Sequence, residues 1–466
     1  MLFTSLDFFV FLAIVLAGYA LLPASRRWAL LLAASAVFYG WSSPRALVFL
    51  AATTAIAFAA AAALQRESRP ATKRAVVIAA VSLILGSLAA FKYLKLPVAS
   101  PAGFSFYAFS AVSLVVDAYR GKLPGRVHAG ETALYLAWFP KILAGPIERA
   151  TSFLPQLQGG LHADPGRLVL GFQMMVWGLV KKVVIADSLA PLVDHAFGIA
   201  AYASPVELLL SVYFFAFQIY CDFSGYTDIA IGLSLLLGVQ LGENFRRPYF
   251  SRSPAEFWSD RWHISLAHWF RDYLYIPLGG SRAGTWRHYL NVMIVFAASG
   301  LWHAGLGYGV GWTFLAWGVA NGLYVWGSIA SGPVWKRLGE RLPRISSHFA
   351  WNALRVFFTF HLIAIAWILF RARTLGDAWT IARKIATNLA HLPATLSHYP
   401  FSAEQVAGIV LIALLLVVEW LDERQPLFER LRALSPAWRT ACGYLALALL
   451  VLAGHWQARE FVYMQF

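Results

Sequence analysis

Long apolar segments recur along the whole chain, and each has nearly the length that a helix needs to cross a membrane. Clear examples are residues 7–23, 46–64, 75–91, 205–220 and 404–420. A helix crosses the ~30 Å hydrocarbon core of a bilayer with about twenty apolar residues. Together with shorter apolar segments, these runs predict an all-α, polytopic membrane helical bundle with about ten to twelve spans.

The composition supports this class and leaves little room for a soluble domain. Of the 466 residues, 59% are hydrophobic and 13% are charged, and the mean hydropathy is +0.61. No polar segment is long enough to fold by itself, so we expect residues 1–466 to form a single membrane domain. Residues 1–6 contain no lysine or arginine and many spans follow them, which argues against a cleaved signal peptide.

The chain is basic, with 38 Lys and Arg against 23 Asp and Glu and a net charge of +15. In a soluble protein this balance would suggest nucleic acid as a partner. Here the charges gather in short segments between apolar runs, as cytoplasmic loops do. The clusters are Arg66, Arg69, Lys73 and Arg74; Arg120, Lys122 and Arg126; and Lys336, Arg337, Arg341 and Arg344. We therefore expect topology signals rather than nucleic-acid binding, with the N-terminus outside if the first cluster is cytoplasmic.

Two apolar segments are interrupted in ways that a simple span is not. Residues 101–119 begin with Pro and Gly and end near an acid, and residues 132–148 contain Pro140, Lys141 and Pro146. Broken or re-entrant helices occur at membrane depth where they are buried in protein or line a wet cavity. These segments indicate either an internal cavity or tunnel, or ordinary kinked spans with polar ends.

The segment 254–280, PAEFWSDRWHISLAHWFRDYLYIPLGG, combines charged and aromatic residues. On a continuous helix its apolar side chains would share one arc, with acidic and basic residues opposite. The apolar arc would contain Trp258, Trp262, Leu266, Trp269 and Tyr273. This pattern predicts an amphipathic helix in the membrane interface. His268 would be solvated, and His263 would lie at the border of the two faces, as a structural histidine or facing into the protein.

A second histidine, His303, ends the apolar run 289–302. If the basic residues Arg282 and Arg287 are cytoplasmic, fourteen helical residues rise ~21 Å and place His303 beyond the bilayer midplane. Ionisable groups at that depth are costly and commonly functional. The surrounding glycines allow close approach of a substrate or another helix; they are Gly300, Gly305, Gly307, Gly309 and Gly311. The alternative is a buried imidazole bonded to a backbone carbonyl.

The residues available limit the chemistry of this region. The chain has no HExxH or GxSxG motif, and its two cysteines, Cys221 and Cys442, lie in apolar surroundings. Metal binding and a serine nucleophile are therefore not expected. Proton abstraction from a hydroxyl that attacks an activated carbonyl remains, because the pKa of histidine near ~6.5 suits a general base.

Several segments in order resemble a known family. RWHISLAHWFRDYLYIPLGG (261–280), SGLWHAG (299–305) and WTFLAWG (312–318) are similar to the membrane-bound O-acyltransferases. The likeness is to the bacterial branch that acetylates alginate and related cell-surface polysaccharides, and it covers essentially the whole chain. Further matching segments are MLFTSLDFFVFL, FYGW (38–41), GFSFYAFSAVSLVVDAYRG (103–121), FPKILAGPI (139–147), GLVKKVVIADSLA (178–190), QIYCDFSGYTDIAIGLSLLLG (218–238), ENFRRPYFSRSPAEFW (243–258) and FVYMQF (461–466).

This resemblance implies a helical bundle around a central tunnel, which an acyl thioester enters from the cytoplasm and an acceptor hydroxyl from the other side. The histidines of the family motifs fall on His303 and His263, and the resemblance implies that they are catalytic. Arg261, Arg271 and Asp272 are the family-like supporting residues, and we expect Arg271 and Asp272 to pair. The family usually has Gly after the GLWH histidine, whereas this chain has Ala304, whose methyl group slightly narrows the approach.

The sequence therefore predicts an inner-membrane O-acetyltransferase for an exported, alginate-like polysaccharide. We expect no bound cofactor or metal, acetyl-CoA or another acyl thioester as donor, and a periplasmic or membrane-anchored transferase as partner. Membrane lipid would surround the protein, and nucleic acid would have no role. Two alternatives stay open: a non-catalytic transporter or flippase for a lipid-linked glycan, and a lipid or protein acyltransferase of the same family with a long-chain donor.

Overall fold

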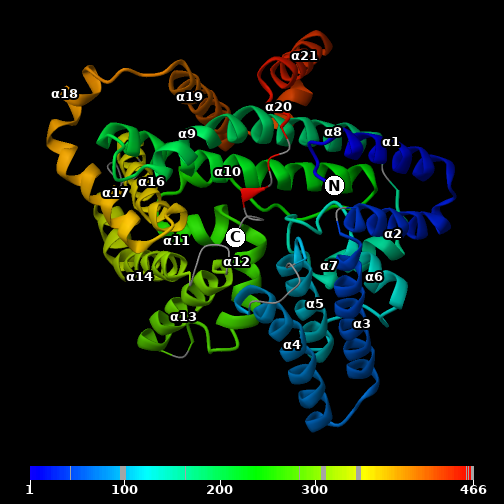
Figure 1. Cartoon of the computed structure of the whole chain (residues 1–466). Helices are drawn as coiled ribbons and strands as arrows, with labels where there is room; N and C mark the ends of the chain where they lie inside the picture. Colours follow the sequence, from blue (N-terminus) through cyan, green and yellow to red (C-terminus); the bar gives the residue numbers. More distant parts are fainter. Residues whose placement is uncertain are drawn as a thin grey trace. The chain divides into compact units, whose positions relative to one another are not determined.

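The computed structural model of the chain is built from helices (Figure 1). It describes residues 1–41, 43–94, 101–162, 164–282, 284–305, 311–342, 348–457, 459 and 461–462. Within these residues every regular element is a helix, and the one extended pairing is an isolated bridge between Phe245 and Trp262. The predicted all-α class is confirmed.

Seven of the described helical stretches are long and apolar enough to cross a membrane. They are α3 (Pro44–Arg66), α4 (Pro70–Tyr93), the continuous stretch Pro165–Gly198, α10 (Pro205–Leu236), α16 (Phe349–Arg371), α19 (Ala403–Arg424) and α21 (Pro436–Ala453). Two further apolar helices are shorter, α1 (Leu6–Leu21) and α5 (Phe104–Tyr119). The chain is thus a multi-pass membrane protein, and the number of ten to twelve spans stays a prediction.

The chain divides into two compact units, each assembled from separate stretches of sequence. Of the described residues, unit 1 contains those within 1–180, 223–243 and 456–462, and unit 2 contains those within 181–222 and 244–455. The division falls inside the stretch Pro165–Gly198 and inside α10, so both long helical stretches contribute to both units. The predicted single domain over the whole chain stays a prediction.

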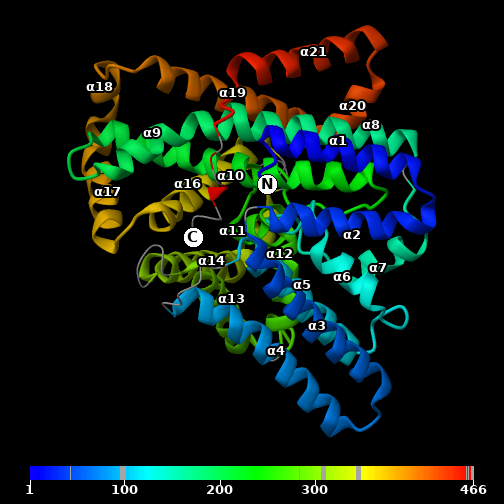
Figure 2. The ribbon, with the colours of Figure 1, turned by 45° about the vertical axis from the view of Figure 1, so that its right-hand side comes forward.

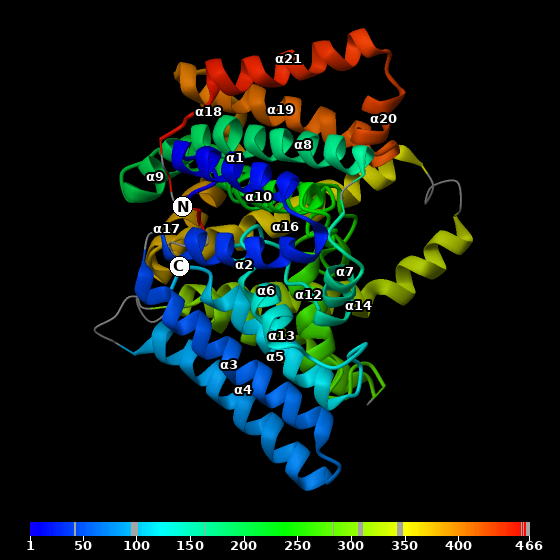
Figure 3. The same ribbon diagram turned by 90° about the vertical axis from the view of Figure 1, so that its right-hand side faces the viewer.

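Unit 1 holds the N-terminal helices, of which α3, α4 and α5 pack against one another (Figure 3). Its other helices are α1, α2 (Ala24–Gly40), α6 (Ala129–Ala137), α7 (Ala150–Gln158), α8 (Pro165–Leu179) and the end of α10. Helices α8 and α10 touch at glycines. A methyl group on Gly171 would lie 2.7 Å from the carbonyl oxygen of Gly232, and one on Gly232 would lie 2.4 Å from that of Gly171. Small residues at such a crossing are typical of helix pairs in membranes.

The interrupted segment 132–148 is irregular in the structure, as its sequence predicts. Helix α6 ends at Ala137, and the following residues turn while staying buried. The ammonium group of Lys141 lies 4.6 Å from the ring centre of Tyr135, whose hydroxyl donates to the backbone oxygen of Glu148 at 2.7 Å. Residues 101–119, in contrast, form one continuous helix from Phe104 onward.

Unit 2 holds the remaining helices, among which α13 (Thr285–His303) and α14 (Trp312–Arg341) lie side by side, with α16 packed against α14 (Figure 2). Its other helices are η1 from Lys181 to Ala186, α9 (Asp187–Gly198), the start of α10, η2 (Pro248–Phe250), α11 (Pro254–Glu256), η3 (Phe257–Arg261), α12 (Ile264–Phe270), η4 (Arg271–Tyr275), α17 (Leu375–Asn388), η6 (Leu389–His391), α18 (Leu392–Ser397), α19, α20 (Leu427–Ala433) and α21. Both histidines singled out by the sequence belong to this unit.

Candidate active site

His263 lies at a break in the helix, and the predicted continuous amphipathic helix over 254–280 is wrong. The segment consists of α11, η3, α12 and η4, and it is interrupted at Trp262 and His263. Trp262 is extended, and His263 adopts a left-handed conformation with φ 46° and ψ 52°. Such a conformation is costly for a residue other than glycine and persists where the surroundings impose it. His268, expected to be solvated, is half-buried.

The break is held by a short stretch from elsewhere in the chain. Phe245 pairs with Trp262 in an antiparallel bridge. The backbone NH of Arg246 donates to the oxygen of Arg261 at 2.9 Å, and that of Ile264 donates to the oxygen of Asn244 at 2.9 Å. These bonds satisfy backbone groups that a continuous helix would have paired locally. Helical periodicity carries no sign of such a nonlocal partner, which is why the amphipathic pattern failed to predict the break.

The same stretch fixes the imidazole of His263. Its Nδ1 lies 3.1 Å from Oδ1 of Asn244, which also accepts from the backbone NH and the hydroxyl of Ser265 at 3.1 and 2.8 Å. A backbone NH can only donate, so the shared atom of Asn244 is the amide oxygen. His263 must therefore donate from Nδ1, which leaves the lone pair of the neutral ring on Nε2. Burial lowers the pKa of His263 to about 3, so the ring is neutral near pH 7.

His303 is the last residue of α13 and is 5% exposed. Aromatic rings surround it: the ring centres of Trp302, Trp317 and Phe370 lie 4.4, 5.2 and 5.2 Å away. The burial expected from the sequence is observed, while the depth of His303 in the bilayer stays a prediction. α13 is not among the seven helices of span length and hydropathy in the described chain.

The glycines near His303 bring two helices together. A methyl group on Gly300 would lie 2.6 Å from the backbone oxygen of Phe314, and one on Gly318 would lie 2.4 Å from that of Phe296. Both glycines therefore serve close approach of α13 and α14. For Gly300 this is one of the two roles predicted for the glycines around His303, whereas Gly318 was not among the predicted residues. Ala304 is buried, and a methyl group on Gly311 would fall 2.3 Å from its Cβ. Gly307 and Gly309 lie outside the described residues.

A cluster of tryptophans connects the surroundings of the two histidines. Trp317, beside His303, stacks on Trp367 at 6.0 Å, and Trp367 lies 5.1 Å from Trp262, the neighbour of His263 in sequence. Asn321 is fully buried under the cluster, where it accepts from the indole NH of Trp258 at 3.0 Å. Such an apolar, aromatic setting has a low dielectric constant, which strengthens electrostatic interactions inside it.

The predicted supporting residues divide into two kinds of ion pair. Arg261 contacts Glu256 at 2.7 Å and Glu423 at 2.8 Å with only 11% of its side chain exposed, and Arg247 contacts Glu423 and Asp422. Arg271 and Asp272 pair at 2.9 Å as expected, but on the surface, with exposures of 53% and 30%. Arg261 is therefore part of a network beneath the helix break, whereas the Arg271–Asp272 pair is peripheral.

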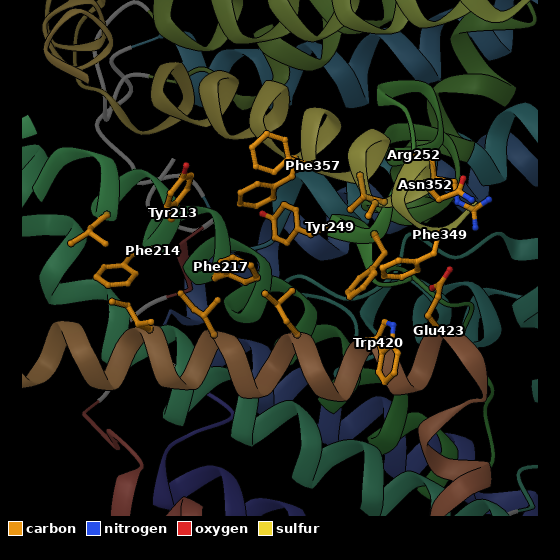
Figure 4. A pocket seen from close by; sticks show the side chains of 18 residues that line it. Tyr213, Phe214, Phe217, Tyr249, Arg252, Phe349, Asn352, Phe357, Trp420 and Glu423 are labelled. Carbon is orange, nitrogen blue, oxygen red and sulfur yellow. The ribbon is translucent and has the colours of Figure 1, made fainter. Parts of the chain in front are cut away.

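A cavity of about 910 Å³ opens between α10, α16 and α19 of unit 2, with residues 249–252 at one side (Figure 4). Its lining is mostly aromatic and aliphatic, with Arg252, Asn352 and Glu423 together at one end. Neither His263 nor His303 lines it. This cavity therefore includes neither histidine, and the tunnel past both histidines stays a prediction.

Sequence reasoning missed two buried asparagines, of which Asn244 positions the imidazole of His263 and Asn321 binds the indole of Trp258. Asn244 and Asn321 are both fully buried, although an isolated asparagine in a polar or apolar run gives little warning of this. Asn244 stands in the segment ENFRRPYF, which resembles the family's sequence but has no periodicity or motif that indicates a buried asparagine. Among the described residues, no group of three or more His, Cys, Asp or Glu side chains is arranged to hold a metal ion.

Comparison with known proteins gives a consistent result. A model of the membrane-bound O-acyltransferase family matches residues 38–371. Over 401 residues the chain is 35% identical to a probable alginate O-acetylase of Azotobacter vinelandii, covering 81% of this chain and 77% of the relative. It is 34% identical to a probable alginate O-acetylase of Pseudomonas aeruginosa, with 89% and 81% covered, and 29% identical to a peptidoglycan O-acetyltransferase of Helicobacter pylori, with 85% and 82% covered.

Proposed function

Because the chain belongs to the membrane-bound O-acyltransferase family, we propose that it transfers acetyl groups toward hydroxyls of an exported cell-surface polysaccharide. The names of its relatives support acetyl as the acyl group and a cell-surface glycan, alginate-like, as the acceptor. Within the structure, the observation that carries the proposal is a pair of buried histidines in one unit, one of them held as a neutral base.

We assign the proton transfer to one of these two imidazoles. The acceptor hydroxyl attacks the carbonyl carbon of an acetyl thioester, and its proton moves to the lone pair of the imidazole. The carbon–sulfur bond then breaks, and the departing sulfur takes up that proton. A neutral ring with its lone pair on Nε2 and its Nδ1–H bound to a fixed acceptor suits this role, because the third group orients the base.

The aromatic surroundings contribute in a second way. Tightly packed rings such as Trp317 and Phe370 around His303 exclude water, and water would otherwise compete with the acceptor for the thioester. Arg261 has a supporting role, because it holds the segment that carries His263. We give the exposed pair of Arg271 and Asp272 a local structural role only.

The donor, the location and the partner follow from the same proposal. We propose acetyl-CoA or another acyl thioester as a donor from the cytoplasm, and the inner membrane as the location. A periplasmic or membrane-anchored transferase would receive the acetyl group where the acceptor lies outside. The family favours an enzyme over a non-catalytic flippase, and the relatives' names favour acetyl over a long-chain donor.

The test is the ester-linked acetate on surface polysaccharides of the host, measured in a strain that lacks this protein. Complementation with the native chain should restore the acetate. His303→Ala and His263→Ala should lower it by about 10²- to 10⁴-fold, the usual contribution of a general base. His268→Ala changes a half-buried histidine five residues from His263 and is the matched control. Native acetate levels in the deletion strain or in both histidine variants would contradict the proposal.

A further inference from the structure

The cavity between α10, α16 and α19 is separate from the histidines, and its walls have a consistent arrangement along its length. Tyr213 and Phe214 of α10 lie toward one end, and Phe349, Trp420 and Glu423 lie toward the other (Figure 4). On α19 the lining extends from Ile409 to Glu423, and fourteen helical residues rise ~21 Å. This length exceeds the ~15 Å of hydrocarbon in one leaflet of a bilayer.

The polar end lies where two helices of span length end together. α16 begins at Phe349 and α19 ends at Arg424, and both helices are apolar enough to cross a membrane. Their shared end therefore belongs at the membrane interface, where aromatic and basic residues gather. Trp420 lines the cavity there, and the guanidinium of Arg424 lies 3.9 Å from the centre of its ring.

The charges at this end favour an anionic ligand. The one lining carboxylate, Glu423, is already bound to Arg247 and Arg261, at 2.7 and 2.8 Å. Arg252 also lines the cavity and is exposed, and its guanidinium has no ion pair with any residue that the structure describes. The net charge of the groups at this end is +1, from four positive and three negative side chains. The positive side chains are Arg247, Arg252, Arg261 and Arg424, and the negative ones are Glu256, Asp422 and Glu423.

The walls and the charged end of the cavity together indicate the kind of occupant. A flexible hydrocarbon chain makes van der Waals contact with aromatic and aliphatic walls such as these, and those contacts stabilise it there. An apolar lining that ends beside an arginine at the membrane interface thus favours a lipid.

We propose that this cavity binds a membrane lipid with an anionic head group. The acyl chain lies among Phe217, Phe360 and Leu416, and the phosphate lies beside Arg252 and Asn352 at the membrane interface. Bound there, the lipid joins α10, α16 and α19 within unit 2. The site is independent of the acetyl transfer assigned to the histidines, so failure of either proposal leaves the other intact.

Native mass spectrometry of the full-length, detergent-purified protein tests this site. The probes are phosphatidylglycerol and phosphatidylcholine with identical acyl chains, added at matched concentrations. We expect phosphatidylglycerol to occupy the protein more than phosphatidylcholine does. Arg252→Gln removes one charge-assisted contact and should lower phosphatidylglycerol binding about tenfold, toward the phosphatidylcholine level.

Two further variants complete the experiment. Ala353→Trp places a large side chain in the cavity lining and should lower binding of both lipids. Arg337→Gln changes an exposed arginine on α14; it is the charge control and should bind both lipids as the native chain does. Equal binding of both lipids with no effect of Arg252→Gln would overturn the proposal. A membrane-spanning polypeptide that co-purifies and is released by Ala353→Trp would also overturn it, in favour of a partner helix.

Discussion

Asn244 accepts a hydrogen bond from Nδ1 of His263, across nineteen positions of sequence and at 3.1 Å. This contact explains both the tautomer of the imidazole and the left-handed backbone of His263, because the same asparagine receives the NH of Ser265 and offers its own carbonyl to Ile264. The buried residue Asn244 thus holds both the start of α12 and the imidazole of His263, which directly precedes that helix.

Replacing Asn244 should show how much activity depends on the orientation of the His263 ring, because the ring itself stays in place in the sequence. Asn244→Ala leaves the Nδ1–H of His263 and the NH of Ser265 without the acceptor, and we expect acetylation to fall by about 10- to 100-fold, as for lost outer partners of functional histidines. Asn244→Asp keeps an acceptor and adds a negative charge, which favours the imidazolium and raises the pKa of His263 toward 6.5. Initial rates against pH should then show a new acidic limb in Asn244→Asp. Full activity of Asn244→Ala would contradict a positioning role.

The lowered pKa of His263 predicts a dependence of stability on pH. Burial holds the pKa at about 3, whereas the unfolded chain has the ordinary value of 6.5. Between these values the unfolded state binds more protons, so acidification below pH 6.5 must reduce stability, with a limiting slope of about 1.4 kcal/mol per pH unit. In detergent, His263→Gln should lose this part of the slope between pH 6 and 4, and His268→Gln should keep it. Identical slopes in all three proteins would show that His263 is not buried in its neutral form.

The sequence was most informative where local pattern decides structure. The runs 46–64, 75–91, 205–220 and 404–420 all lie within helices of span length, because uninterrupted apolar composition is sufficient for a membrane helix. The run 7–23 forms the shorter helix α1. The interruption of 132–148 was also predictable, since proline and glycine act locally.

The sequence was least informative where distant segments decide structure. Spacing predicted one apolar arc on the segment 254–280, and three residues of this arc, Trp262, Leu266 and Trp269, are each below a tenth exposed. The helix nevertheless breaks at His263, because residues 244–246 supply hydrogen bonds that no periodicity reveals. Both histidines could be predicted as site residues from the sequence, because each lies in a family-like motif and His303 ends an apolar run. The cluster of tryptophans that connects their surroundings could not be predicted, because its members come together only in the folded chain.

Replacing either of the two arginines of the segment 261–280 should affect stability to a different degree. Arg261→Gln leaves Glu256 and Glu423 without a shared, mostly buried cation, and we expect a loss of about 1–3 kcal/mol. Arg271→Gln breaks an exposed pair with Asp272 and should cost at most ~1 kcal/mol. Thermal unfolding of the two purified variants gives the comparison. Arg261→Lys should recover only part of the loss, since an ammonium cannot reproduce the fork of contacts. Equal effects of Arg261→Gln and Arg271→Gln would refute the distinction.

The crossing of α13 and α14 predicts that a single methyl group far from the reacting atoms reduces activity. Gly318→Ala would place its Cβ 2.4 Å from the backbone oxygen of Phe296, so α13 must shift. His303 stands about two turns farther along that helix. Overpacking of this kind costs about 1–3 kcal/mol, and a displacement of ~1 Å at a catalytic group can cost about 10²-fold in rate.

Gly327 lies on α14, as Gly318 does, and provides the matched control because no atom lies within 4 Å of a methyl group added there. Gly327→Ala should gain about 0.5–1 kcal/mol from helix propensity and keep native acetylation. Thermal unfolding and ester-linked acetate should be measured on both variants at matched expression. Native behaviour of Gly318→Ala would mean that α13 and α14 tolerate separation and that the position of His303 does not depend on their contact. Loss of activity in Gly318→Ala alone would tie the placement of this imidazole to the glycines of the crossing.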